Sequence, residues 1–262
     1  MSCPLCGGTE LATVFRYDEP PPGETPFGLE PYEREYRRCG TCGHFVAVTS
    51  MDLAELYAGE YVDATYSAEG IARSYERIMA LPPERSDNVQ RVARIRERLG
   101  ERGTVLDVGS GLGVFPARMR DAGWACTALD PDPRAVEHAR AAAGVDAMCA
   151  DFMVADDLGR FDLVTLNKVV EHVPEPVAML ARTREFLAPE GRVYVEAPDG
   201  EAAATDPDGP NREEFFIEHL HVFSMSSLSL LADRAGLLTE VAERLREPSG
   251  KYTLFAFLRT AR

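Results

Sequence analysis

The chain has 262 residues, of which 45% are apolar and 27% charged, and its formal net charge is −15. This length can hold one full α/β domain plus a smaller module. The acidic balance argues against nucleic acid as a partner, because proteins that bind polyphosphates neutralise them with Lys and Arg. No apolar run approaches the ~20 residues that span a bilayer, and the first residues lack the basic and apolar regions of a secretory signal. We therefore expect a cytoplasmic protein without a membrane partner, whose oligomeric state is open.

Two pairs of cysteines lie near the start of the chain. Cys3 and Cys6 are separated by two residues, as are Cys39 and Cys42, and a glycine follows each pair. Two thiolates at this spacing can reach one tetrahedral ion, and four thiolates fill its coordination shell, so such an ion is structural and not catalytic. The sequence therefore predicts a zinc ribbon in which these four cysteines bind one Zn²⁺. His44 could compete as a ligand, but a surface position is expected for it.

Tyrosines are frequent in residues 51–85, which we expect to form a connecting or lid segment. They are Tyr57, Tyr61, Tyr66 and Tyr75. After this segment, Ser86 is a suitable N-cap and Gly100 a stop signal for a helix. The arginines at 91–98 interleave with apolar residues at helical spacing, which predicts that they lie on a solvated helix face.

Strands and helices alternate along the rest of the chain. The predicted strands are 104–108, 124–130, 145–150, 161–167 and 192–197, and the helices between them are 114–122, 134–143 and 177–187. A further helix at 226–235 and two strands near 237–243 and 252–259 follow. Repeated strand–helix units with nearly continuous apolar strands indicate a doubly wound α/β fold, with a mostly parallel sheet covered on both faces. Two other cysteines, Cys126 and Cys149, are expected to be buried free thiols.

Asp107, Gly109 and Gly111 belong to a glycine-rich turn after the first strand of this domain. Glycines let the backbone approach a ligand closely at the carboxyl end of a strand, where doubly wound sheets bind their ligands. A dinucleotide fingerprint needs a third glycine where this chain has Val114, and Asp107 is poorly placed beside a pyrophosphate. The turn suits a cationic amino-acid cofactor better, which favours S-adenosylmethionine over a nicotinamide dinucleotide.

Two more aspartates end strands in the order that such a cofactor requires. Asp130 ends the second strand, where a carboxylate can accept hydrogen bonds from both hydroxyls of a ribose. Asp151 follows the third strand, and with Phe152 it offers an acceptor and an apolar surface for an adenine ring. A glycine-rich turn alone is a weak signal, but its combination with both aspartates is a strong one.

The second part of the chain resembles the class I S-adenosylmethionine-dependent methyltransferases. The motifs that carry the resemblance are LDVGSGLG (106–113), ALDPD (128–132), CADF (149–152) and LNKVVEHVPEP (166–176). The resemblance implies a seven-stranded sheet whose last strand is antiparallel. The expected cofactor contacts are Asp107, Gly109 and Gly111 at the methionine part, Asp130 at the ribose, Asp151 and Phe152 at the adenine, and Asn167. We thus expect a zinc ribbon at 1–50, the connecting or lid segment at 51–85, and a methyltransferase domain at 86–262.

Two Glu-His pairs are candidates for the group that removes a proton from the methyl acceptor. Glu171-His172 follows the fourth strand, although His172 could instead cap the helix that begins near Pro174. A similar EHVP run occurs in quinone-pathway methyltransferases. Glu218-His219 lies in an aromatic segment after the fifth strand, and an imidazole with a pKa near 6.5 can accept a proton at neutral pH.

The order of the three parts, a zinc ribbon, a tyrosine-rich segment and a class I domain, resembles that of the sugar C-methyltransferases of deoxysugar pathways and their shorter relatives in natural-product clusters. The segment around His219 resembles that family's Tyr-x-Glu-His-Leu-x-x-Phe-Ser run, with Phe216 in place of the tyrosine. This resemblance implies that His219 is the general base and that Glu218 binds or orients the substrate. The sequence ends after the methyltransferase sheet, without the further C-terminal domain of that family.

On this basis we expect a small-molecule substrate, either a sugar or a natural-product intermediate. One alternative is a ribosomal RNA guanine methyltransferase, which also joins a zinc ribbon to this fold, but the net charge of −15 opposes RNA binding. The other alternative is a non-catalytic module that only binds the cofactor. Whether the acceptor atom is C, O or N, and whether His219 or His172 is the base, stays open at this point.

Overall fold

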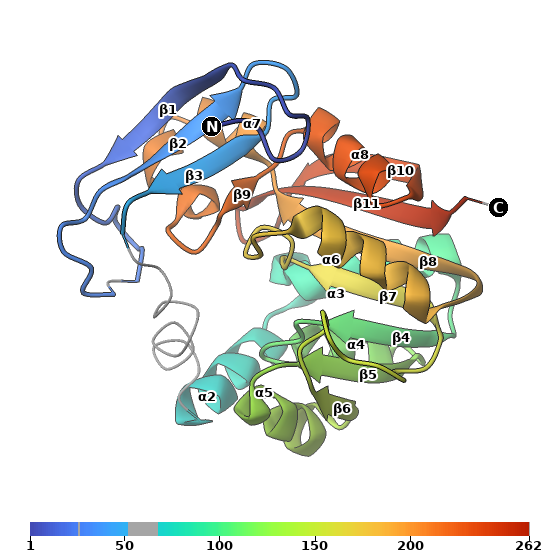
Figure 1. Cartoon of the computed structure of the whole chain (residues 1–262). Coiled ribbons are helices and arrows are strands. Elements are labelled where there is room, and N and C mark those ends of the chain that lie inside the picture. The colour runs from blue at the N-terminus through green and yellow to red at the C-terminus, as the bar shows by residue number, and fades with distance from the viewer. Residues whose placement is uncertain (26, 52–67, 262) are drawn as a thin grey trace.

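The computed structural model describes residues 1–25, 27–51 and 68–261. Figure 1 shows a small antiparallel sheet beside a larger sheet that is covered by helices. In the predicted connecting segment, α2 (Ala68–Met79) contains Tyr75, while Tyr57, Tyr61 and Tyr66 lie outside the described residues. Among the helices that the structure describes, none is long and apolar enough to cross a membrane.

The larger sheet has seven strands in the order β10-β11-β8-β7-β4-β5-β6. In chain order they are β4 (Thr104–Val108), β5 (Ala125–Asp130), β6 (Asp146–Cys149), β7 (Phe161–Asn167), β8 (Leu187–Pro198), β10 (Leu237–Arg246) and β11 (Tyr252–Thr260). Strands β4 to β8 pair in parallel, whereas β11 is antiparallel to both of its neighbours. The predicted doubly wound, mostly parallel sheet with an antiparallel last strand is confirmed.

Helices cover both faces of this sheet because alternate strand residues point to opposite sides. In β4, Leu106 and Val108 belong to one apolar cluster and Val105 to the other. The first cluster includes residues of α6 (Pro176–Arg182) and α8 (Met225–Arg234). The second packs against α2 and against α3 (Asp87–Leu99), α4 (Val114–Asp121) and α5 (Pro133–His138), which continues as a π-helical turn over Ala139–Ala143.

The small sheet combines two distant parts of the chain. Its strands are β1 (Leu11–Tyr17), β2 (Arg34–Cys39), β3 (Phe45–Thr49) and β9 (His221–Val222). Phe45 pairs with Val222 and Val46 with His221, so a segment from between β8 and α8 completes a sheet that begins in the first fifty residues. Figure 1 shows β9 beside β3 at the junction of the two sheets.

The predicted solvated face of α3 is wrong for two of its arginines. Arg91 is only 7% exposed and bonds to one carboxylate oxygen of Glu196, which is itself fully buried on β8. Arg94 reaches the other oxygen at 2.8 Å. Residues three apart lie on one side of a helix, and here that side faces the sheet. The carboxylate of Glu196 accepts hydrogen bonds from both guanidinium groups there and offsets their charge.

Two expectations about single side chains are also wrong. His44 is fully buried, because β3 pairs with β9 and its Nε2 lies 3.0 Å from Nδ1 of His221. Cys149 is exposed, because it ends β6, the edge strand of the larger sheet. Cys126, on the interior strand β5, is a buried free thiol as predicted.

Replacement of Glu196 by alanine should destabilise the fold strongly, because it leaves two guanidinium groups without their buried partner. We expect Glu196→Ala to lower the free energy of unfolding by about 3–5 kcal/mol in urea titrations. The control is Glu101→Ala, which removes the exposed partner of Arg96 and should change it by less than about 1 kcal/mol. Equal effects of the two variants would contradict a structural role for the buried pair.

Candidate active site

The glycine-rich turn after β4 exposes its backbone to a cavity with a volume of about 990 Å³. Gly109 and Gly111 have φ values of +69° and +51°, which side chains disfavour. A Cβ atom on Gly109 would lie 2.9 Å from Cγ2 of Val169. The turn therefore needs glycine both for its conformation and for close packing against the loop after β7.

Asp107 lies beneath this turn and is 2% exposed. One of its oxygens accepts hydrogen bonds from Oγ1 of Thr165 at 2.6 Å and Nδ2 of Asn167 at 2.8 Å. Burial raises the pKa of Asp107 to about 7, although these two bonds oppose the shift. Two buried atoms, Oδ1 of Asn167 and Oγ of Ser110, have no hydrogen-bond partner among the described residues. Since both residues line the cavity, they fit a ligand that supplies polar partners there.

Asp130, at the end of β5, also lines the cavity. Its oxygens accept N–H groups of Gly111 at 2.8 Å and Asp132 at 2.9 Å, and burial raises its pKa. A carboxylate has about four lone-pair directions, so Asp130 keeps acceptor capacity for two hydroxyl groups of a ligand.

The residues after β6 form another part of the same wall. Asp151 is exposed and accepts the N–H of Met153 at 2.8 Å. Phe152 is 3% exposed and packs against Phe186, with ring centroids 5.5 Å apart. Met153 is 38% exposed and lines the cavity as well, so it adds apolar surface that the sequence reasoning did not identify.

The structure brings the two Glu-His pairs into one site. The rings of His172 and His219 lie 4.8 Å apart between centroids. Both line a smaller cavity of about 180 Å³, which shares Lys168, His172 and Lys251 with the larger one. The two Glu-His pairs that the sequence offered as alternatives therefore belong to one site, where the two cavities meet.

Backbone carbonyls orient both imidazoles. Nδ1 of His172 lies 2.9 Å from the carbonyl oxygen of Glu218, and Nδ1 of His219 lies 3.0 Å from that of Glu214. Because a carbonyl only accepts, each Nδ1 donates, and Nε2 is the basic nitrogen of each neutral ring. His172 does not cap α6, which begins at Pro176 after Glu175.

Burial sets the protonation of this site. It holds the pKa of His219 well below the ordinary value of 6.5, and the neighbouring His172 adds to this. The pKa of His172 is lowered for the same reason. The expected pKa near 6.5 is thus wrong for His219, whose imidazole is neutral at neutral pH.

Glu171 is fully buried beside the two histidines, and its carboxylate oxygens have no hydrogen-bond partner among the described residues. Burial raises its pKa to about 7. Ligand atoms of Glu171, His172 and His219 lie within 4.8 Å of one another, a grouping that could in principle hold an ion. Lys168 and Lys251 line the same cavity, together with Glu213, Glu214 and Glu218.

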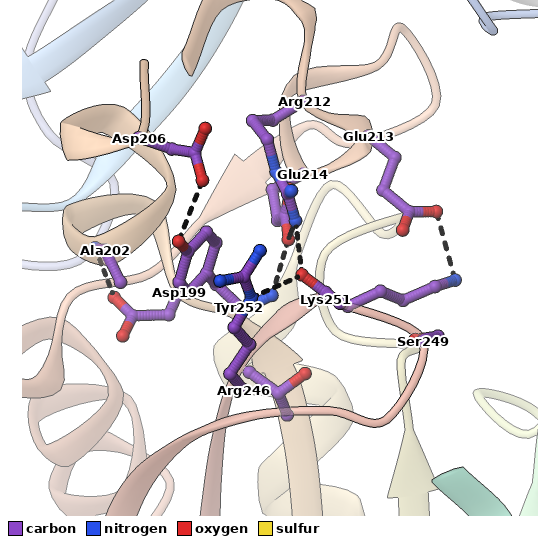
Figure 2. Close-up of polar contacts among 12 residues, drawn as sticks. Asp199, Ala202, Asp206, Arg212, Glu213, Glu214, Arg246, Ser249, Lys251 and Tyr252 are labelled. Atoms are coloured by element: carbon purple, nitrogen blue, oxygen red, sulfur yellow. Dashed lines mark hydrogen bonds and ion pairs between the residues drawn. The ribbon is translucent and has the colours of Figure 1, made fainter. Parts of the chain in front are cut away.

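Figure 2 shows how the other wall of the small cavity is held. Lys251 forms an ion pair with Glu213 at 3.1 Å, and the N–H of Tyr252 donates to Glu214 at 2.6 Å. Arg212 binds the same carboxylate at 2.9 Å. The sequence reasoning gave no role to Lys168, although it lies within the LNKVVEHVPEP motif, and it missed Lys251, which only the pairing of β11 with β8 brings here.

The four cysteines of the two pairs converge as the spacing predicts. The Sγ atoms of Cys3 and Cys42 are 3.6 Å apart and those of Cys6 and Cys39 are 3.5 Å apart. A tetrahedral ion with Zn–S bonds of about 2.3 Å separates its sulfurs by roughly 3.8 Å, so the donor set and its dimensions fit zinc. Three of the cysteines are buried in the apolar cluster that contains α6 and α8, where a metal can stabilise the ribbon.

The family model of the methyltransferase domain matches residues 75–240, which is more than half of the chain. The chain is an S-adenosylmethionine-dependent methyltransferase. Solved structures share its fold. The magnesium protoporphyrin IX methyltransferase of Synechocystis has a TM-score of 0.58 at 15% identity, covering 77% of this chain and 99% of that protein. The 1,6-didemethyltoxoflavin N1-methyltransferase of Burkholderia thailandensis has a TM-score of 0.56 at 21% identity, covering 84% and 96%.

Relatives with similar sequences include ubiquinone biosynthesis O-methyltransferases. That of Pseudomonas paraeruginosa is 32% identical over 131 residues, covering 47% of this chain and 56% of the relative. That of Xanthomonas oryzae is 35% identical over 123 residues, covering 44% and 49%. The chain thus matches only about half the length of these curated relatives, and the match establishes the reaction class without the acceptor.

Proposed function

We propose that this methyltransferase modifies a small molecule, a sugar or another natural-product intermediate, bound where the two cavities meet, and that His219 is the general base. The observation that carries the proposal is the pair of neighbouring imidazoles, of which His172 lines both cavities and His219 lines the smaller one. S-adenosylmethionine supplies an activated methyl group on a sulfonium. The protein then has to align the acceptor and remove its proton.

In this proposal the larger cavity holds the cofactor. The methionine part is held by Asp107, Gly109, Gly111 and Asn167. This assignment is supported by the glycine turn, which has no side chains at Gly109 and Gly111, and by Oδ1 of Asn167, which has no hydrogen-bond partner among the described residues. Asp130 accepts hydrogen bonds from the ribose hydroxyls. Asp151 and Phe152 bind the adenine, with apolar surface added by Met153.

The acceptor's proton passes to Nε2 of His219, which becomes an imidazolium whose Nδ1 still donates to the Glu214 carbonyl. Glu171 and Glu218 line the same cavity and favour that positive charge. Glu218 additionally orients the acceptor, while its carbonyl oxygen holds His172. The cysteine cluster binds a structural zinc ion and takes no part in the chemistry.

Small-molecule acceptors are favoured by two observations. The two solved relatives and the ubiquinone-pathway relatives are named for small acceptors, and the chain carries a net charge of −15. A ribosomal RNA acceptor would require a basic surface, so this second candidate is tested by adding RNA and measuring salt-dependent retention. A mass-shift screen of sugar and phenolic metabolites with the purified enzyme tests the main proposal, and methylation of RNA alone would contradict it.

Replacement of Asp130 should weaken cofactor binding. We expect Asp130→Ala to reduce the affinity for S-adenosylmethionine by about 1–3 kcal/mol in calorimetric titrations, because ribose hydroxyls lose their acceptor. Asp132→Ala is the matched control, since Asp132 caps α5 and does not line the cavity. Unchanged affinity in Asp130→Ala would remove this residue from the cofactor site.

Removal of one cysteine ligand should release the metal. Elemental analysis should find about one zinc ion per chain, and Cys39→Ser should lose both the ion and solubility, because metal binding supplies roughly 10–16 kcal/mol to the folding of such ribbons. Cys149→Ser, outside the cluster, should keep both. A soluble, metal-free wild-type protein with normal turnover would refute the assignment.

Loss of the proposed base should slow turnover and spare cofactor binding. We expect His219→Ala to reduce kcat by about 10²–10⁴-fold with near wild-type affinity for S-adenosylmethionine, and His172→Ala to cost less. The pKa of His219 lies below 6.5. Because only the neutral imidazole accepts a proton, kcat should stay flat from pH 8 to about pH 6.5 and fall only under more acidic conditions.

Two outcomes would reassign the chemistry. If His172→Ala abolishes turnover while His219→Ala retains it, the base lies on the loop after β7. An acid limb centred near pH 7 would instead reflect Glu171 or Asp107, whose pKa values are both raised to about 7 by burial.

A further inference from the structure

The residues that carry the proposed base, 215–221, are held by side chains of the small sheet; we call them the histidine segment. We propose that Tyr36 of β2 is a positioning residue for His219, so that the N-terminal module contributes to the geometry of the active site. This inference rests on the proposed role of His219, and its test separates the two.

Tyr36 contacts the histidine segment through its hydroxyl group. The side chain is fully buried, and its oxygen lies 2.6 Å from the carbonyl oxygen of His219 and 2.9 Å from that of Phe216. Both carbonyls only accept, so the phenol shares its one proton between the two ends of the turn. The position of the His219 backbone is therefore defined from the N-terminal sheet.

A buried ion pair from the same module holds the preceding residues. Arg34 donates to the carbonyl oxygen of Phe215 at 2.7 Å, and Glu24 accepts the N–H of Ile217 at 2.7 Å. Arg34 and Glu24 lie 2.6 Å apart, with side chains 2% and 0% exposed. Backbone groups buried without partners are costly, so these contacts also explain how an irregular segment can lie in the interior.

The same strand reaches the cysteine cluster. Arg34 and Tyr36 lie on β2, which ends at the proposed zinc ligand Cys39. Next to it, β3 pairs with β9 at the end of the histidine segment, and Figure 1 shows these strands side by side. A metal that orders the end of β2 thereby orders the strand from which Tyr36 holds His219.

The cofactor contacts do not depend on this arrangement, because Asp107 and Asp130 end strands of the larger sheet. Loss of the Tyr36 hydroxyl should therefore affect proton removal and leave cofactor binding intact. A base displaced by about 1 Å can cost two orders of magnitude in rate. A less confined imidazole also recovers a pKa closer to 6.5, because burial is what lowers it.

The experiment compares Tyr36→Phe with Tyr17→Phe in the full-length, metal-loaded protein. Tyr17 lies on β1 of the same sheet, is 8% exposed and donates to the carbonyl oxygen of Pro210 at 2.7 Å, outside the histidine segment. Tyr36→Phe should lower kcat by about 10–100-fold and move the acid limb of kcat upward toward pH 6.5. Its zinc content and its affinity for S-adenosylmethionine should stay at wild-type values. Tyr17→Phe should leave all four quantities unchanged.

Combination with His219→Ala distinguishes the two proposals. If Tyr36 acts through His219, the double variant should be no slower than His219→Ala alone. Full multiplication of the two effects, or an unchanged kcat and pH profile in Tyr36→Phe, would overturn the positioning role. If His219→Ala alone keeps full activity, the proposed base has failed.

Glu24→Gln is the second variant, for use if Tyr36→Phe does not fold. It keeps the shape of the acceptor for the Ile217 N–H and removes the charge that holds Arg34. We expect it to move kcat and the acid limb in the same direction at constant cofactor affinity. Equal loss of cofactor affinity and kcat would show general destabilisation and overturn the proposal.

Discussion

The parallel pairing of β4 with β5 and β7 is the constraint on which the rest of the structure depends. Parallel strands end at the same edge of a sheet, so Asp107, Asp130 and Asn167 meet there although they are far apart in the chain. Both faces of these strands are buried, and slippage by one residue would exchange the two apolar clusters. The register that the core requires is therefore also the register that assembles the cofactor cavity.

The small sheet has a different role, which is to hold an irregular polar segment beside the cavity that we propose binds the cofactor. The histidine segment lies between β8 and α8 and has no long strand of its own, so its carbonyl and N–H groups need other partners. The N-terminal module supplies them from Glu24, Arg34 and Tyr36. Its own core is too small to be stable alone, and the cysteine cluster offers the additional cross-link. In this view the cysteine cluster and the proposed active site are connected through the N-terminal module.

Sequence reasoning identified those residues of the larger cavity whose signals are local. Asp107, Gly109 and Asp130 are recognisable because a strand, a turn and a following residue type suffice to define them. The convergence of the four cysteines was also foreseeable, because two ligands at short spacing must face one ion. The mostly parallel sheet followed from apolar strands that alternate with amphipathic helices.

The residues that were missed or misjudged depend on contacts between distant segments. Arg91 was expected at the surface because the helical spacing of the apolar residues in α3 predicts a polar face that contains the arginines. Its burial becomes favourable through Glu196, a fully buried carboxylate near the C-terminal end of β8. The surroundings of Lys251 and His44 could not be predicted for the same reason, since each is formed by the pairing of strands that are distant in the chain. The pKa of His219 was misjudged for the same reason, because desolvation is a property of the assembled site.

A base with a lowered pKa accords with methyl transfer from a sulfonium. The reaction removes a positive charge from the cofactor, and proton abstraction places one on His219, so the net charge of the two joined cavities is unchanged. Burial makes an isolated imidazolium costly, and in the proposed mechanism the carboxyl groups of Glu171 and Glu218, which line the same small cavity, offset that cost in their ionised forms. Before the reaction the same burial keeps His219 neutral beside a cationic cofactor, where a protonated imidazole would be repelled. If His219 is the base as proposed, burial therefore holds it in the proton-accepting form until the acceptor supplies the proton.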